Sequence, residues 1–337
     1  KTATDPTGKN ILVGVLGRGG NTVYALDVSD PANFNASKVL WEYSDADMGN
    51  SLGTPIITRV NTGDPAIIIS NGYNSASGHA IFYVLNIRTG ALIAKLDTKA
   101  GDTGANSNGM ATPKGWDEDR NGTADVLYGG DLLGNVWEYD ISDSNPVNWG
   151  PVFGTAASPQ PLYIAKDASG NRQPITSGFT IGLDPLTFER WIFFGTGRYL
   201  TYGDPTDKSV QTWYGLIDSG SQIPSVTTRN STTLKQRSIV VTTTVNGNTV
   251  RAFGAATAGD MAGLKGWYVD LKDPTARGER IVTDTVLIGQ VLLAASIIPS
   301  NDACDFGGSG FINAIDAFTG GALSSPFFDI SGNGSVD

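Results

Sequence analysis

The chain has 337 residues, of which 40% are hydrophobic and 17% charged, and its formal net charge at pH 7 is −10. This length suits two average domains or one large all-β domain, and the hydrophobic fraction is that of an ordinary soluble globular protein. The negative charge argues against nucleic acid, or an anionic membrane surface, as the main partner. No apolar run reaches the roughly 18 residues of a membrane span, and there is no signal peptide. Because the chain begins at Lys1 rather than Met, we expect it to be the C-terminal part of a larger protein.

Two rare residue types limit the chemistry further. With His79 as the only histidine and Cys304 as the only cysteine, a zinc site built from several His and Cys ligands is implausible. Cys304 can form no internal disulfide, so any disulfide partner would lie in another part of the parent chain. A serine or cysteine triad would have to use His79, which we expect to be an exposed turn residue.

Strand patterns dominate from the N-terminus onward. The 43 glycines and 16 prolines separate short apolar or alternating runs rich in Val, Ile, Tyr and Phe, which is the pattern of short strands joined by turns. Two of the strand ends lead into a Thr-Gly turn, at Thr89-Gly90 and Thr319-Gly320. Several runs look like variants of one unit, a strand that ends on an acidic or Asn residue before a turn: Val23–Val28, Phe82–Ile87, Val136–Ile141, Trp267–Leu271 and Ile312–Ala317.

A nine-residue segment between the second and third of these units has the ligand order of a calcium loop. Asp117, Asp119, Asn121 and Asp125 place side-chain oxygens at positions one, three, five and nine, a glycine stands at position six, and the main-chain carbonyl of Thr123 is available at position seven. Alternate residues turn oxygens inward in such a loop, and the glycine makes the sharp bend. Ca²⁺ fits better than Mg²⁺, because it takes several oxygen ligands and tolerates irregular geometry.

This loop differs from an EF-hand at position twelve. That position is Tyr128 rather than a bidentate glutamate, so Asp125 has to complete the shell. The alternative is an Asx-rich hairpin turn that binds no ion. Four correctly spaced side chains and the glycine favour a cation. Electrostatics favours it too, since two carboxylates about 4 Å apart repel by roughly 4 kcal/mol at an effective dielectric near 20, and this loop gathers three.

The C-terminal half contains a second kind of segment, rich in Ser and Thr, from Ser219 to Thr249. We expect a solvent-facing insertion or an irregular blade there, with a hairpin that turns at Asn246-Gly247. Four tryptophans spread along the chain are predicted to pack between blades rather than to form a ligand platform: Trp41, Trp137, Trp191 and Trp267.

The last nine residues repeat the calcium-loop frame, again with glycine at position six. This copy has two carboxylates instead of three and stands at the chain end, where fraying is common, so the predicted second calcium site is the weaker one. Its candidate ligands are Asp329, Ser331, Asn333, Ser335 and Asp337.

The repeated strand units predict an all-β protein, specifically a β-propeller with irregular insertions. Repeats of roughly 40–50 residues made of strand–turn–strand units are typical of propeller blades, and dividing the chain length by about 48 gives about seven blades. Closure into a ring would also remove the edge strands that an open sheet of this size exposes. We therefore expect residues 1–337 to form a single propeller domain.

The order of these motifs resembles the C-terminal β-propeller domain of the PilC/PilY family of type IV pilus tip-associated adhesins. The likeness covers nearly the whole chain and includes the calcium loop. The segments that carry it are Gly14–Gly20, Val23–Pro31, Leu40–Tyr43, Ser70–Asn74, Asn108–Pro113, Tyr128–Trp137, Phe194–Tyr199, Gly266–Leu271, and Cys304 with Gly307 and Gly308.

This resemblance implies an extracellular or cell-surface, pilus-associated location on a Gram-negative bacterium. It implies pilins or minor pilins, and host-cell surfaces, as partners, and a role in pilus biogenesis, twitching motility and adhesion. It further implies that calcium in the loop sets whether the protein opposes pilus retraction, with Asp117, Asp119, Asn121 and Asp125 binding through side chains and Thr123 through its main chain. The chain has no Arg-Gly-Asp triplet, so integrin contact by that route is doubtful.

Two alternatives to this calcium-controlled, non-enzymatic module remain open at the level of sequence. The first is a quinoprotein-type dehydrogenase, because such enzymes share this kind of propeller and use calcium. Their calcium ligands are dispersed, whereas the candidate ligands here are contiguous, and the vicinal cysteine pair of many such enzymes is impossible with Cys304 alone. The second alternative is a purely structural calcium that clamps two blades and is permanently filled outside the cell.

Overall fold

The structure is a computed structural model of the chain, and it describes residues 2–4, 8–50, 53–224, 232–300 and 308–336. Cys304 and Asp337 lie outside these ranges. The chain divides into two compact units, Lys1–Ile164 and Ala165–Asp337, which we describe separately. Within the described ranges each helix is a single 3-10 turn, too short to cross a membrane: η1 (Gly17–Gly19), η2 (Pro31–Asn33), η3 (Ala36–Lys38), η4 (Pro146–Asn148) and η5 (Asp204–Thr206).

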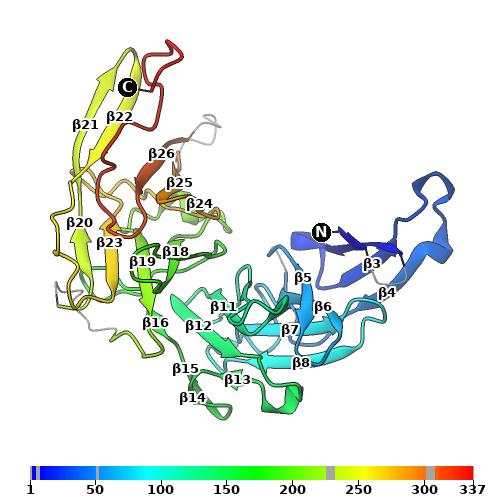
Figure 1. Cartoon of the computed structure of the whole chain (residues 1–337). Coiled ribbons are helices and arrows are strands. Elements are labelled where there is room, and N and C mark those ends of the chain that lie inside the picture. The colour runs from blue at the N-terminus through cyan, green and yellow to red at the C-terminus, as the bar shows by residue number, and fades with distance from the viewer. Residues whose placement is uncertain (1, 5–7, 51–52, 225–231, 301–307, 337) are drawn as a thin grey trace. The chain divides into compact units, whose positions relative to one another are not determined.

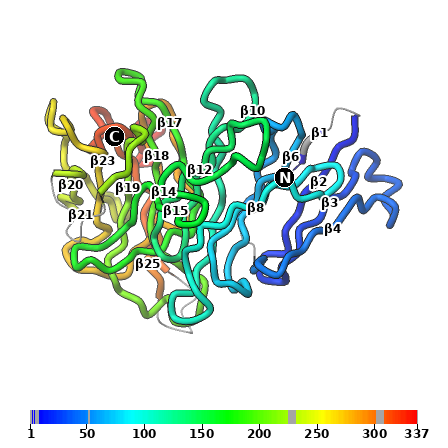
Figure 2. Tube along the Cα trace, turned by 90° about the horizontal axis from the view of Figure 1, so that it is seen from below, coloured from blue at the N-terminus to red at the C-terminus, as the bar shows by residue number. Residues whose placement is uncertain are grey.

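The first unit contains three main sheets that follow one another along the chain (Figures 1 and 2). The first sheet has the order β1 (Thr2–Thr4), β2 (Asn10–Val15), β3 (Val23–Asp27), β4 (Val39–Tyr43). The second has the order β10 (Thr123–Ala124), β5 (Ile56–Val60), β6 (Pro65–Ser70), β7 (Ile81–Asn86), β8 (Leu92–Asp97). The third has the order β13 (Gly150–Pro151), β12 (Asn135–Asp140), β11 (Val126–Gly130), β9 (Lys114–Trp116), and β16 (Tyr163–Ile164) also pairs with β12. A small hairpin joins β14 (Phe153–Thr155) to β15 (Ser158–Gln160).

The second unit contains two main sheets and a separate hairpin. The fourth sheet has the order β17 (Thr180–Leu183), β18 (Arg190–Gly195), β19 (Thr212–Asp218), β23 (Gly266–Asp270), β20 (Lys235–Arg237). The fifth has the order β24 (Val286–Ile288), β25 (Val291–Ile298), β26 (Ser309–Asp316). The hairpin pairs β21 (Ile239–Val245) with β22 (Asn248–Phe253). Neighbouring strands are antiparallel except β10 on β5 and β20 on β23, which are parallel.

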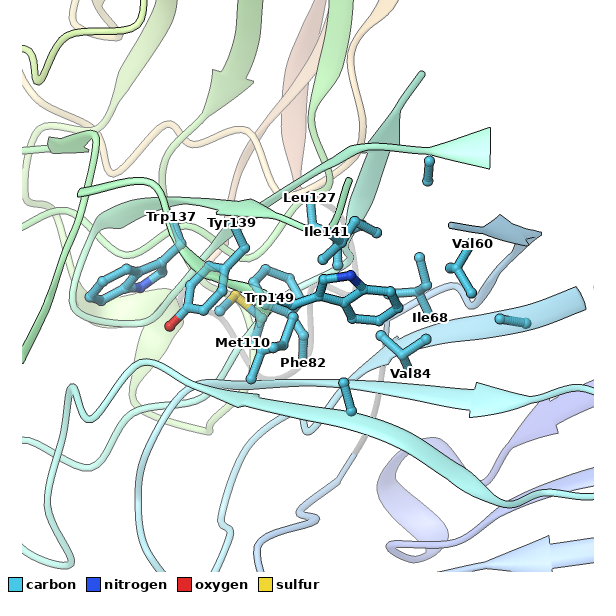
Figure 3. Close-up of a cluster of buried hydrophobic side chains, with 14 of the residues drawn as sticks. Val60, Ile68, Phe82, Val84, Met110, Leu127, Trp137, Tyr139, Ile141 and Trp149 are labelled. Carbon is cyan, nitrogen blue, oxygen red and sulfur yellow. The ribbon is translucent and has the colours of Figure 1, made fainter. Parts of the chain in front are cut away.

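The second sheet is buried on both faces, which explains why β6 and β7 read as continuous apolar runs. Successive side chains of a strand point to opposite faces. Accordingly Ile68 and Phe82 pack against the third sheet, in a cluster with Leu127 and Trp137 (Figure 3). Their neighbours along each strand pack against the first sheet, in a second cluster: Ile67, Ile69, Ile81 and Tyr83 with Ile11, Val13, Val23 and Trp41. Sheets that are covered on both sides lack the polar alternation of a half-exposed strand.

Tryptophans fasten neighbouring sheets together in each unit by the same contact. In the first unit the indole of Trp41, on β4, donates from Nε1 to the carbonyl of Ile87 at 2.8 Å and lies on Gly90, in the turn after β7. In the second unit Trp267, on β23, donates from Nε1 to the carbonyl of Ala317 at 2.7 Å and lies on Gly320, in the turn after β26. The four tryptophans predicted to pack between blades are all buried, which confirms that prediction.

The turns beneath these two indoles have one geometry, as their shared sequence pattern predicts. In the first, the Asn86 side-chain oxygen accepts the backbone N–H groups of residues 88 and 89. In the second, an Asp316 carboxylate oxygen accepts those of residues 318 and 319. Gly90 and Gly320 then adopt φ values of 71° and 69°, a region that favours glycine. The strand–turn unit read from the sequence is therefore a structural repeat.

The all-β class is confirmed, and the exposed hairpin expected near Asn246-Gly247 is present as β21–β22. The described residues form seven sheets, of which five have three or more strands and two have only two strands. Residues 141–179 contain only strands of two or three residues. The number of blades, about seven, stays a prediction. Closure into a ring and a single domain stay predictions.

We expect Gly320→Ala to destabilise the second unit. A Cβ there would lie 2.5 Å from the Trp267 indole, at a φ of 69°. Backbone strain of about 1–2 kcal/mol should add to overpacking of about 1–3 kcal/mol, measured by urea unfolding. Gly247→Ala is the matched control, because Gly247 has a φ of 82° but open space around it, so it should show only the strain. Equal losses in the two variants would contradict the packing role of Trp267.

Candidate calcium site

The nine-residue loop from Asp117 to Asp125 connects two neighbouring sheets of the first unit. It follows β9 and precedes β11, which are paired strands of the third sheet. Within the loop, however, β10 pairs in parallel with β5 of the second sheet, with Thr123 opposite Arg59 and Ala124 opposite Val60. The loop therefore starts and ends in one sheet and extends the edge of the next.

The first half of the loop is wrapped around the Asp117 carboxylate. Its Oδ1 accepts the backbone N–H of Asn121 at 3.1 Å, and its Oδ2 accepts that of Gly122 at 2.8 Å. The Asn121 Oδ1 in turn accepts the backbone N–H of Thr123 at 2.8 Å. Arg120 and Gly122 take up left-handed φ values of 62° and 91°, which is how the chain makes the sharp bend that the glycine at position six predicted.

Three carboxylates converge in this loop. One oxygen from each of Asp117, Asp119 and Asp125 lies within 4.8 Å of the other two. Two oxygens that bind one Ca²⁺ at 2.3–2.6 Å are at most about 5 Å apart, so this spacing fits a single ion. The donors are also hard oxygens, as Ca²⁺ requires. Each carboxylate oxygen has two lone pairs, so those that accept loop amides still have a lone pair for a cation.

Asn61, which is not among the predicted site residues, connects this loop to the second sheet. Its Nδ2 donates to the Asp125 Oδ1 at 2.9 Å and to the carbonyls of Ala124 and Ile141 at 3.1 and 3.2 Å. Its Oδ1 accepts the Thr123 hydroxyl at 2.9 Å. Asn61 stands in the turn between β5 and β6, where the run Asn-Thr-Gly-Asp signals a turn but nothing local signals a contact 64 residues away.

Asp125 is the member of the three that the fold holds most firmly. It is buried, whereas Asp119 is exposed. Besides Asn61 on Oδ1, its Oδ2 accepts the backbone N–H of Glu118 at 2.8 Å. Its own N–H donates to Trp116 and its carbonyl accepts from Ile141, both at 2.8 Å. Hydrogen bonds from the protein alone therefore fix the orientation of the Asp125 carboxylate, at position nine of the loop.

The C-terminal loop repeats the backbone pattern of the first. The Asp329 Oδ1 accepts the N–H of Asn333 at 3.1 Å, the Oδ2 accepts that of Gly334 at 2.7 Å, and the Asn333 Oδ1 accepts that of Ser335 at 2.8 Å. Gly334, at position six, has a φ of 84°, close to the 91° of Gly122. Residues 331–336 are exposed, and the predicted ligand Asp337 lies outside the described residues.

The histidine makes a contact with a carboxylate that its local sequence does not indicate. His79 is half-buried rather than exposed, and its Nδ1 lies 3.1 Å from Asp97 Oδ1. Lys99 pairs with the same carboxylate at 2.7 Å, and together these partners hold the Asp97 pKa below its usual value although burial opposes the shift. Among the residues that the structure describes, no serine hydroxyl is hydrogen-bonded to the His79 ring.

The stacked antiparallel sheets and the repeated indole contact place the chain in the class of β-propeller proteins. A family model described as the PilY1 beta-propeller domain matches residues 2–248. The chain belongs to this PilY1 family. In the solved structures, the crystal structure of the Pseudomonas aeruginosa PilY1 C-terminal domain superposes with a TM-score of 0.81 at 31% identity, over 98% of this chain and 71% of that one.

Curated relatives extend the match to nearly the whole chain. A type IV pilus biogenesis factor PilY1 homolog from Xylella fastidiosa is 37% identical over 332 residues, which cover 97% of this chain and 25% of the relative. Type IV pilus biogenesis factor PilY1 from Pseudomonas aeruginosa is 33% identical over 360 residues, covering 97% of this chain and 30% of the relative. The chain therefore spans between a quarter and a third of the length of these two relatives.

We expect Asn61→Ala to loosen the loop from the second sheet. The substitution leaves the carbonyls of Ala124 and Ile141 and the Asp125 carboxylate without this donor, which should cost about 1–3 kcal/mol in chemical unfolding. Asn106→Ala is the control, because that exposed side chain contacts only Asp102 within its own loop and its removal should cost less than about 0.5 kcal/mol. Indistinguishable unfolding curves for both variants would refute the bridging role.

Proposed function

We propose that this chain is the calcium-binding propeller of a type IV pilus biogenesis protein at the cell surface or on the pilus. The observation that carries the calcium assignment is the approach of Asp117, Asp119 and Asp125 to within 4.8 Å in a loop of calcium-binding sequence. Asn121 and the main chain of Thr123 complete the proposed ligand set. Membership of the PilY1 family supports the pilus assignment.

The proposed ion would act on the pairing of two sheets. Bound calcium supplies positive charge that offsets the mutual repulsion of the three carboxylates. Asp125 is fixed between the Glu118 amide and Asn61, and β10 lies beside β5, so whatever orders the loop also favours β10 on the edge of the second sheet. Calcium binding and docking of β10 are therefore coupled in this proposal, and each stabilises the other.

This coupling can serve either a permanent clamp or a switch. A clamp requires only that the site is filled outside the cell, where calcium modules bind at about 10⁻⁴–10⁻³ M. A switch requires two states of the loop that differ in calcium affinity. We favour the switch, in which occupancy sets the balance between pilus extension and retraction and so supports twitching motility and surface attachment. Pilins or minor pilins, and host-cell surfaces, are the proposed partners, and the role is not enzymatic.

We propose the C-terminal loop as a second, weaker calcium site. Its backbone reproduces that of the first loop around Asp329 and Asn333. It offers fewer carboxylates than the first loop, and Asp329 is exposed. Metal analysis of the purified chain should therefore find one calcium at low free calcium and two at high, and Asp329→Asn should remove only the second.

Calcium should raise the stability of the chain, and Asp125→Ala should abolish most of that gain. An ion that binds only the folded state at about 1,000 times its Kd adds about 4 kcal/mol, which denaturant unfolding with and without a chelator will measure. Asp102→Asn is the matched control, because Asp102 also accepts loop amides, from Gly104 and Asn106, in a loop without the calcium pattern. An equal calcium response in all three proteins would rule out this site.

The pilus role is testable by domain exchange in Pseudomonas aeruginosa. The chain should replace the matching part of PilY1 and restore surface pili and twitching to a strain that lacks the native protein. The Asp125→Ala version should restore pili with altered dependence on external calcium. A chimera that is exported and stable but leaves the cells without pili would contradict the pilus assignment while leaving the calcium measurements intact.

A further inference from the structure

Two strands of the second unit border one groove. Strand β22 of the hairpin and strand β26 of the fifth sheet both line a groove of about 720 Å³, together with the C-terminal segment 322–330. Figure 1 shows the course of the two strands and of the C-terminal segment. In the described chain β22 pairs only with β21, and β26 only with β25. Each strand therefore has one paired edge and one edge without a strand partner.

The unpaired edge of β26 presents alternate backbone groups. The N–H of Ala317 donates to the carbonyl of Gln290, so these two residues form a hydrogen-bonded pair. In an antiparallel ladder such pairs alternate with pairs that share no backbone hydrogen bond, and the next pair, Val291 and Asp316, is of that second kind. It follows that residues 309, 311, 313 and 315 bond to β25, and that the N–H and C=O groups of Gly310, Ile312 and Ala314 point away from it. In the described part of the chain these three residues have no backbone partner on that side.

The edge of β22 has the same character. The Asn246-Gly247 turn makes Val245 and Asn248 a hydrogen-bonded pair, so the N–H and C=O groups of residues 249 and 251 point away from β21. Beyond the irregularity in β21, the N–H of Gly254 donates to Ser238, which turns Phe253 outward as well. Arg251 shows the consequence, because its side chain is only 3% exposed while the residue as a whole is half-buried, so solvent reaches its backbone.

A buried side-chain network, rather than backbone pairing, connects the two strands. Arg251 on β22 donates from Nε to the Asn313 Oδ1 on β26 at 2.7 Å, and forms an ion pair with Glu279 at 2.7 Å. Its guanidinium carbon lies 4.1 Å from the centre of the Phe311 ring and 5.6 Å from that of Phe253. This network neutralises the charge of Arg251, the one arginine that lines the groove, and holds the two strands together through side chains. The outward-facing backbone N–H and C=O groups of the two strands take no part in it.

The remaining surface of the groove is mainly apolar, although Thr249, Ser324, Ser325 and Asp329 also line it. Phe327 and Phe328 of the C-terminal segment line it in a T-shaped pair with ring centres 5.2 Å apart. Ile312, on the edge of β26, is 71% exposed. Free backbone donors and acceptors on two strands, beside aromatic and aliphatic side chains, are what an extended peptide uses when it joins a sheet.

We propose that the groove between β22 and β26 binds an extended, uncharged apolar peptide segment of a partner protein as an added strand. Its backbone pairs with residues 310, 312 and 314 on one side or with 249, 251 and 253 on the other, and its side chains contact the phenylalanines. The six residues of β22 offer an edge of about 20 Å. The proposal rests on the strand edges and not on calcium or on the pilus assignment, although Asp329, a candidate ligand of the second calcium site, also lines the groove.

The test uses the whole chain and a defined probe. The probe is a fluorescein-labelled, end-capped, uncharged heptapeptide, Ser-Val-Thr-Val-Thr-Val-Ser, and its control is the same peptide N-methylated at the three central residues, which cannot donate backbone hydrogen bonds. We expect the probe to raise fluorescence anisotropy and the control to bind at least tenfold more weakly. Hydrogen-exchange mass spectrometry should show slower exchange in residues 248–253 or 309–316 with the probe.

Proline variants can locate the binding edge. A proline at an outward-facing position removes an N–H group that points away from the paired strand, so the hydrogen bonds between β21 and β22 and between β25 and β26 are kept. Thr249→Pro or Ile312→Pro should weaken probe binding at least tenfold, according to which edge is used. Thr244→Pro is the matched control, since the N–H of Thr244 points out of the opposite edge of the hairpin, away from the groove, and binding should persist. Circular dichroism establishes that each variant is folded.

Three results would overturn the proposal. The first is equal binding of the N-methylated peptide, which would show apolar contact without strand addition. The second is a failure of the probe to bind at millimolar concentration. The third is a concentration-dependent dimer in sedimentation that Thr249→Pro or Ile312→Pro abolishes, because a second copy of the chain would then be the occupant.

Discussion

Burial of both faces of the second sheet is the constraint on which the first unit depends. Strands β6 and β7 place alternate side chains into two separate clusters, one shared with the first sheet and one with the third. Neither neighbouring sheet can be lost without exposing a continuous row of Ile, Val and aromatic side chains to water, and apolar burial is the dominant favourable contribution to folding. The sheets must therefore stay face to face, and only their edges and turns are free to carry other properties.

The acidic loop is placed where that freedom exists. Its two ends belong to the third sheet, but β10 extends the edge of the second. An ion in this loop would act on the edge contact and on Asn61. Ala124 of the loop also belongs to the core cluster that contains Phe82 and Trp137, so order in the loop would be linked to the packing of that core.

Local patterns in the sequence predicted a large part of this arrangement. The strand–turn units ending at Asn86 and Asp316, the hairpin at Asn246-Gly247 and the bend at Gly122 each depend on residues close together in the chain, so their patterns are visible in order. The convergence of Asp117, Asp119 and Asp125 is of the same kind, since nine contiguous residues contain it.

Properties that arise from distant contacts were not predictable in this way. Asn61 reads as an ordinary turn residue, and its contact with Asp125 depends on two sheets being neighbours. His79 was expected to be exposed, yet the fold brings Asp97 to it from a strand end 18 residues away.

The paired indole contacts impose an order on the formation of the fold. Trp41 has to find a carbonyl 46 residues further along the chain, and Trp267 one that is 50 residues further. During synthesis from the N-terminus, the first and fourth sheets therefore emerge with Trp41 and Trp267 uncovered until the turns that follow β7 and β26 have been made. Contacts of such long sequence separation slow folding, and the interval in which a freshly made sheet lacks its neighbour is when the nascent chain is most exposed to aggregation.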